Sequence, residues 1–161
     1  MLTFHDLYSA YSLEVYRFAY WLAGNTEDAE DITSETFVRA WTNLARIRTE
    51  TLKAYLLTIA RNVYLNQLRK VNRRQRLLEV HPDPNPGPES RVEKRAELEM
   101  VSKVLQSLPE SDRVAFIMRV GHDLPYLEIA RALQISESAA KVKVHRVRKR
   151  MLAARLAEEI P

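Results

Sequence analysis

A ten-residue segment near the C-terminus combines many cations with a regular apolar spacing. Residues 141–150 carry six Lys or Arg side chains and no acidic side chain. Apolar residues in and around the segment are spaced i, i+4, i+7 and i+11, which places them on one narrow face of a helix: Ala140, Val144, Val147 and Met151. The cations point away from that face. They are therefore placed to pair with phosphate groups.

The residues before this segment have the layout of a helix-turn-helix. A short apolar helix over about 125–133 is followed by a tight connection at 134–135, and Ser136 stands where a cap would begin the next helix. In such motifs the second helix reads the major groove of a duplex. Outward-facing Val142 has no core to fill, and a thymine methyl is one group that it could contact. The alternative is an ordinary solvated basic helix.

A second basic cluster, residues 69–76, closes a long predicted helix that starts near residue 51. Cations at a helix C-terminus also complement the macrodipole, so a purely structural role is the alternative. Upstream, Arg61, Asn62 and Asn66 are predicted to lie beside an exposed Tyr64. Cations, amides and an aromatic surface together are typical of single-strand binding.

An acidic stripe is predicted on the helix that begins near Thr26, capped by Asn25 or Thr26. Asp28, Asp31 and Glu35 are spaced i, i+3 and i+7, opposite the apolar face. A protein-docking face is the favoured interpretation. Helix-dipole compensation and a carboxylate metal site are the alternatives, but no histidine or second carboxylate helix stands near the stripe in sequence.

The elements that position these groups are predicted to be helices throughout, so the expected fold class is all-α. Leu7, Val15, Phe18 and Leu22 share one face of a first helix that Gly24 ends. Leu52, Leu56 and Val63 face inward on the third helix. After residue 81, helices are predicted from about 89 to 108, then near 110–120, 125–133 and 136–157.

Charge and composition divide the chain in two. The net charge is −4 in residues 1–50, +6 in 51–81, −3 in 82–112 and +5 in 113–161. In each half of the sequence, the N-terminal part is therefore acidic and the C-terminal part is basic. This sorting favours two polyanion contacts. There is no cysteine, which excludes a disulfide scaffold, and no apolar run is long enough to span a membrane. A cytoplasmic protein without membrane insertion is the simplest interpretation.

Four prolines between residues 82 and 88 predict an extended linker. The expected domains are an N-terminal helical domain over 1–80, a Pro-rich linker over 81–92 and a C-terminal helix-turn-helix domain over 93–161. The stiffness of the prolines is expected to keep the two domains from packing together.

Several segments resemble the extracytoplasmic-function (ECF) sigma factors of bacterial RNA polymerase. In the first half they are residues 28–41 (DAEDITSETFVRAW) and 54–62 (AYLLTIARN), and in the second half residues 108–119, 124–130 and 141–148. The resemblance covers nearly the whole chain in the same order. It implies a sigma-2-like helical bundle and a sigma-4-like helix-turn-helix.

The resemblance implies a protein that binds RNA polymerase core, directs it to promoters and helps to open the duplex. The expected core-docking residues are Asp28, Asp31, Ser34 and Glu35. The residues expected to hold the single-stranded minus-10 element are Arg46, Ile47, Arg61, Asn62, Asn66, Arg69 and Arg73. Those expected to contact the duplex minus-35 element are Ser136, Ser138, Ala139, Lys141, Val142, Lys143, His145, Arg146 and Arg148.

The resemblance also implies which partners the protein binds and which kinds of site it lacks. The partners are polymerase core, promoter DNA and an inhibitory anti-sigma factor, whereas no cofactor, metal or catalytic residue is expected. Two other classes stay open from the residues alone. One is a helix-turn-helix regulator that binds duplex operators without polymerase, although no second apolar interface for a dimer is evident. The other is a metal-dependent nuclease built on the acidic stripe.

Overall fold

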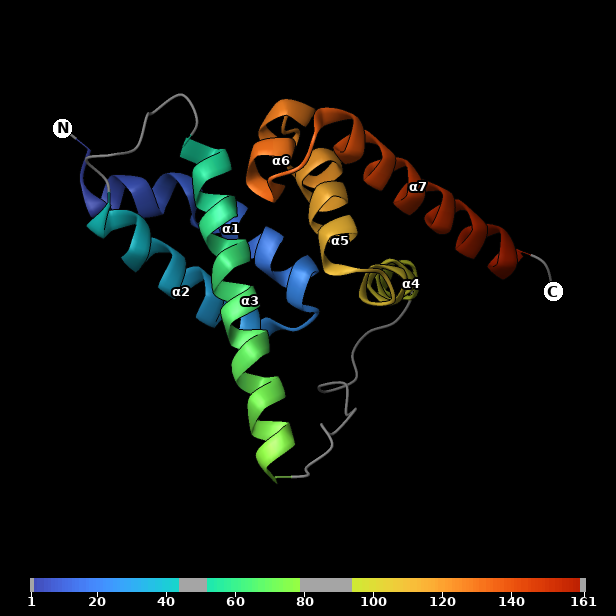
Figure 1. The fold of residues 1–161 in the computed structure, drawn as a ribbon, viewed down its shortest axis with the longest axis horizontal. Helices are drawn as coiled ribbons and strands as arrows, with labels where there is room; N and C mark the ends of the chain where they lie inside the picture. The colour runs from blue at the N-terminus through green and yellow to red at the C-terminus, as the bar shows by residue number, and fades with distance from the viewer. Residues whose placement is uncertain (1, 44–51, 79–93, 160–161) are drawn as a thin grey trace.

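The structure, a computed structural model, describes residues 2–43, 52–78 and 94–159 (Figure 1). These residues are almost entirely helical and contain no strand, as the sequence predicts. The elements are α1 (Phe4–Ala23), α2 (Thr26–Thr42), α3 (Leu52–Leu78), α4 (Lys94–Gln106), α5 (Glu110–Phe116), the π-helical segment η3 (Ile117–Gly121), α6 (Tyr126–Leu133) and α7 (Glu137–Glu159). We call α1–α3 the N-terminal half and α4–α7 the C-terminal half.

The predicted stop of the first helix at Gly24 and the predicted cap of the second at Asn25 are both observed. Thr3 and Asp6 form a capping box at the start of α1, and Gly24 ends the helix in the left-handed region at φ 87°. The side chain of Asn25 then caps α2 by accepting a hydrogen bond from the Asp28 amide at 2.8 Å. One glycine and one amide therefore set the tight turn between α1 and α2, which pack closely against each other.

The third helix crosses α1 and α2, and its C-terminal part projects beyond them (Figure 1). Its inward face is buried at the predicted positions Leu52, Leu56 and Val63. The predicted start near residue 51 and continuation into 76 agree with the observed helix. The basic residues of 69–74 lie on the projecting part, where side chains are exposed.

The C-terminal half contains a detail that helical periodicity does not indicate. The predicted helix near 110–120 is an α-helix only to Phe116 and then widens into η3. The Leu124 amide donates to the Met118 carbonyl at 3.1 Å, which closes the following turn. Gln134, in the left-handed region at φ 56°, then makes the short connection between α6 and α7. The predicted linker and the predicted helix start near 89 lie outside the described residues.

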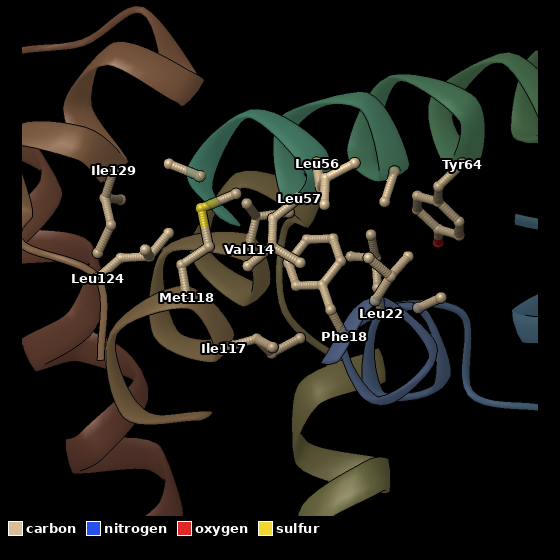
Figure 2. Close-up of a cluster of buried hydrophobic side chains, with 14 of the residues drawn as sticks. Phe18, Leu22, Leu56, Leu57, Tyr64, Val114, Ile117, Met118, Leu124 and Ile129 are labelled. Carbon is tan, nitrogen blue, oxygen red and sulfur yellow. The ribbon is translucent and has the colours of Figure 1, made fainter. Parts of the chain in front are cut away.

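The two halves share one hydrophobic core, so the expectation that they stay apart is wrong. Phe18 and Leu57 from the N-terminal half lie against Val114 and Met118 from the C-terminal half, all fully buried (Figure 2). Exposing these side chains to water would be unfavourable, because burying each large apolar side chain contributes roughly 1.5–3 kcal/mol to stability. Burial of this surface therefore favours packing of the two halves against each other.

Because the core is shared, both halves are expected to unfold in one transition. Met118→Ala should remove buried contacts to both halves and lower the free energy of unfolding by about 2–5 kcal/mol, seen as a single lower melting temperature by circular dichroism. Val120→Ala is the control, because Val120 is half exposed two residues away. Two separate transitions in the wild type, with only one shifted by Met118→Ala, would contradict the shared core.

Candidate nucleic-acid interfaces

The recognition helix α7 is built as the sequence predicts. Ser136 Oγ accepts a hydrogen bond from the Ala139 amide at 3.0 Å and caps the helix. Ala140, Val144 and Val147 are fully buried against α5 and α6. Val142 is 49% exposed, and the polar and basic side chains that surround it on the outer face are exposed too: Ser138, Lys141, His145, Arg146 and Arg148.

One predicted duplex contact is engaged inside the protein. Lys143 Nζ lies 3.1 Å from Asp112 Oδ1 and 3.1 Å from Ser111 Oγ, and its side chain is only 21% exposed. Asp112 is itself buried, so this ion pair joins α7 to α5. Lys141, in contrast, remains exposed and rests over the ring of Tyr126 at 5.7 Å from the centroid. The two lysines therefore have different environments, although the sequence treats them alike.

A cation that the sequence analysis missed lies beside this surface. The Arg119 guanidinium stacks on the Tyr126 ring at 4.3 Å and donates to the Leu124 carbonyl at 3.1 Å. Arg119 belongs to η3, and the π-helical widening changes the direction of its side chain relative to an α-helical pattern. Periodicity alone therefore could not place it next to α6.

The predicted single-strand surface on α3 is only partly assembled. Asn62, Arg69 and Arg73 are exposed and Asn66 is half-buried, on the side of α3 that carries the basic residues. Tyr64, predicted to be exposed, is instead 7% exposed and packs in the core, where its hydroxyl accepts a hydrogen bond from Arg113 Nη2 at 3.0 Å. Arg46 and Ile47 lie outside the described residues.

Arg61, also predicted to hold single-stranded DNA, is turned toward the C-terminal half. Its Nε and Nη2 donate to the two carboxylate oxygens of Glu110 at 2.7 and 3.0 Å, and Nη1 reaches the Ala132 carbonyl at 3.5 Å. Both side chains of this bidentate pair are less than one-fifth exposed. Such pairs are stronger than single contacts between ions.

The acidic stripe on α2 forms an exposed face. Asp28 accepts a hydrogen bond from the Asn25 side chain at 2.8 Å, and Glu35 pairs with Arg39 at 2.6 Å. Asp31 and Ser34 are exposed between them. Beside this face lies a groove between α1 and α2, lined by Tyr8, Ser12, Leu13, Tyr16, Glu30, Thr33 and Ser34. Within residues 2–43, 52–78 and 94–159, no group of three acidic, histidine or cysteine side chains is arranged to hold a metal ion.

A buried histidine, His122, connects the C-terminal half to α1. His122 Nδ1 lies 2.9 Å from Glu14 Oε1, and Lys53 Nζ lies 3.1 Å from the same oxygen. Burial lowers the pKa of His122 below 6.5, aided by the charges of Lys53 and Arg17 and opposed by Glu14. Burial by itself would raise the pKa of Glu14, but the hydrogen bonds from His122 and Lys53 outweigh it and lower the pKa below 4.5.

This arrangement predicts how stability depends on pH. Because the folded pKa of His122 lies below its unfolded value, the unfolded chain binds the proton first, and stability falls as the pH drops below about 6.5. For one proton the slope is at most about 1.4 kcal/mol per pH unit. In urea titrations between pH 7.5 and 5.5, His122→Gln should flatten this slope, and His5→Gln, the same exchange at an exposed histidine, is the control. Equal slopes in wild type and His122→Gln would contradict the assignment.

Comparison with known proteins matches both halves to regions of one class. Residues 7–74 match Sigma-70 region 2, and residues 98–151 match Sigma-70 region 4. The chain is 30% identical over 156 residues to the ECF RNA polymerase sigma factor SigE of Mycolicibacterium smegmatis, covering 94% of this chain and 61% of that protein. It is 26% identical over 157 residues to the ECF sigma factor SigM of Bacillus subtilis, covering 94% of each.

Solved structures share the fold. The sigma factor RpoE from Bartonella quintana, crystallised with the anti-sigma factor NepR, superposes with a TM-score of 0.76 at 24% identity, covering 94% of this chain and 95% of that one. CnrH, solved in complex with the cytosolic domain of CnrY, gives 0.68 at 22% identity, covering 98% and 89%. At these identities the likeness concerns the fold.

Two Sigma-70 regions in this order, on one helical scaffold with an exposed basic recognition helix, define a sigma factor. Sigma factors direct RNA polymerase to promoters at transcription initiation and are regulatory proteins rather than enzymes. The chain belongs to the extracytoplasmic-function (ECF) sigma factors. No helix in the described part of the chain is long and apolar enough to cross a membrane.

Proposed function

We propose that α2 binds polymerase core, that α7 reads the duplex minus-35 element and that α3 holds the melted minus-10 element. The observation that carries this division of labour is the exposed, polar and basic outer face of α7 on its fully buried apolar stripe. This geometry fits a major groove. The corresponding domains are residues 1–80 and 93–161, with 81–92 as the linker.

The single-strand role of α3 rests on three exposed side chains. Asn62 can read the edge of an unstacked base, and Arg69 and Arg73 can pair with the strand's phosphates. Unstacking costs a few kcal/mol per step, whereas contacts to one trapped base contribute about 1–3 kcal/mol. A small number of trapped bases is therefore enough to favour the melted strand. Catalysis belongs to the polymerase in this proposal, and the chain itself needs no metal or cofactor.

The docking role of α2 rests on charge and on the neighbouring groove. Asp31 and Ser34 are exposed next to the pair of Glu35 with Arg39, and Ser34 also lines the groove that holds Tyr16 and the exposed Leu13. A partner helix with basic side chains would pair with the acidic face, and an apolar side chain on that helix would fill the groove. We propose that this helix belongs to polymerase core and that the two proteins meet in the cytoplasm.

An anti-sigma factor is the proposed inhibitor. RpoE and CnrH, which share the fold, were both solved in complexes, the first with the anti-sigma factor NepR and the second with the cytosolic domain of CnrY. The exposed apolar residues outside the shared core, such as Leu13, Leu98 and Leu152, offer surface for such a partner.

Run-off transcription with purified bacterial core polymerase tests the proposed function. The chain is expected to confer initiation at defined start sites selected from a library of genomic fragments, and core alone should not. A helix-turn-helix regulator would instead bind duplex sites without core and give no start-site choice. Cleavage of the template in the absence of core would identify a nuclease.

A further inference from the structure

One valine lies at the centre of the basic outer face of α7. At about 100° per residue, Val142 lies opposite the fully buried Ala140 and Val144. Its side chain is 49% exposed and belongs to the second turn of a helix that begins at Glu137. The N-terminal turns of a recognition helix are the part that contacts base edges in the major groove. Val142 is therefore placed to face the bases directly.

The two lysines that flank Val142 in sequence are each held by groups of the protein. Lys141 Nζ lies 5.7 Å from the centroid of the Tyr126 ring, on α6. Lys143 Nζ, on the other side of the face, lies 3.1 Å from Asp112 Oδ1, on α5. Both ammonium groups are thus directed away from the middle of the face. The side chain left at the middle is the apolar one of Val142.

An apolar side chain in the major groove has one kind of favourable partner. The base edges there present hydrogen-bond donors and acceptors, and only thymine adds an apolar group, its 5-methyl. Against a cytosine, a valine would cover the N4 amino group and leave that donor without water or an acceptor. Against a purine it would cover acceptors in the same way. A valine in this position therefore favours thymine over the other bases.

We propose that Val142 determines specificity in the minus-35 duplex by contacting the 5-methyl group of one thymine. This inference rests on the proposed function, because it requires α7 to lie in the major groove of that element. It goes further by naming the chemical group that α7 recognises. Ala139, half-buried one turn earlier on the adjoining side of the face, extends the apolar surface that receives the methyl group.

Polar side chains around Val142 confine its effect to one position. Ser138, His145 and Arg146 are exposed on the same face, one turn before or after the valine. They can hydrogen-bond to neighbouring base pairs and to phosphates, which fixes the register of α7 on the duplex. With the register fixed, Val142 contacts the same base pair in every complex. Loss of its contact should therefore change recognition at that base pair and leave the other positions unaltered.

Replacing thymine by uracil tests the contact, because uracil pairs as thymine does and lacks only the 5-methyl group. The measurement is the affinity of holoenzyme, assembled from the full-length chain and bacterial core polymerase, for a promoter that the chain selects in run-off transcription. Each thymine of the minus-35 duplex is exchanged in turn, on both strands. One exchange is expected to lower the affinity about 3- to 5-fold, the effect of one methyl group removed from water. Unchanged affinity after every exchange would overturn the proposal.

The Val142→Ala variant identifies the side chain that makes the contact. Alanine is the better helix former at this exposed position, so the fold should be retained. The variant is expected to bind the thymine promoter about 3- to 10-fold more weakly than the wild type and to bind the thymine and uracil versions equally. Val120→Ala, the same exchange at a 50% exposed valine, is the matched control and should keep the preference for thymine. A preference that persists in Val142→Ala would assign the methyl group to another residue and overturn the proposal.

Methylated cytosine provides the reverse experiment. When the sensitive T·A pair is replaced by C·G, wild-type affinity should fall, and 5-methylcytosine at the same place should recover about 3- to 5-fold by restoring the methyl group alone. The Val142→Ala variant should show no recovery. Absence of recovery in the wild type, or equal recovery in both proteins, counts against the contact. Run-off transcription distinguishes the levels: without start-site choice the proposed function fails, whereas start-site choice with no uracil-sensitive thymine refutes the methyl contact alone.

Discussion

Exchanging both Lys141 and Arg146 for Glu is expected to lower transcription from a minus-35-dependent promoter by at least about 100-fold while holoenzyme still assembles. Both side chains are exposed on the outer face of α7, and neither contributes to the stripe formed by Ala140, Val144 and Val147. Each contact with a base edge or phosphate contributes about 1–3 kcal/mol, and reversing the charge adds repulsion from the backbone.

The salt dependence of duplex binding provides an independent readout. Loss of two phosphate contacts should flatten the slope of log affinity against log salt by about 1.8, because each contact contributes about 0.9. Lys103→Glu, at an exposed position on α4, is the control for a change in overall charge. Unaltered promoter selectivity in the double variant, with wild-type melting behaviour, would show that α7 is not the duplex reader.

Lys143 is left out of this variant because the structure distinguishes it from Lys141. Replacing it by Glu would place two carboxylates together at the partly buried contact with Asp112, and a loss of DNA binding could then reflect damage to the fold. From sequence alone both lysines belong to the same basic run. Their difference depends on the packing of α5 against α7, which no local pattern reports.

The sequence predicts the helices well because their signals are local. The capping residues Thr3, Asn25 and Ser136 and the turn at Gly24 act within a few residues of the chain, and the apolar spacing of α7 needs only helical geometry. The family resemblance adds the order of the two Sigma-70 regions, which the comparisons confirm.

The packing of the two halves could not be predicted in the same way. A proline-rich segment indicates an extended local backbone, but it does not determine whether the domains that it joins share a core. The exposure predicted for Tyr64 is wrong for the same reason, since its hydrogen-bond partner Arg113 comes from the other half. The residues of α3 that the sequence groups into one DNA surface therefore have different environments. Most are exposed, but Arg61 is paired with Glu110.

Changing Asp31 and Glu35 to Lys is expected to weaken core binding by roughly 100-fold while duplex binding by α7 stays intact. Two charge reversals at one docking face replace attraction by repulsion toward a basic partner. The internal cost is small by comparison: the exposed pair of Glu35 with Arg39 is worth only about 0.3–0.5 kcal/mol, and its reversal adds a repulsion of similar size. Thermal stability should therefore stay close to that of the wild type.

A matched control separates the location of these charges from their number. Glu97→Lys with Glu99→Lys makes the same change in net charge on α4, where both side chains are exposed and far from the groove beside Ser34. Titration of labelled chain with core polymerase should show a large loss of affinity for the α2 variant and little change for the α4 variant. If both lose affinity equally, core senses only the overall charge of the chain. If neither does, the acidic face of α2 is a solvated surface, and polymerase docks elsewhere.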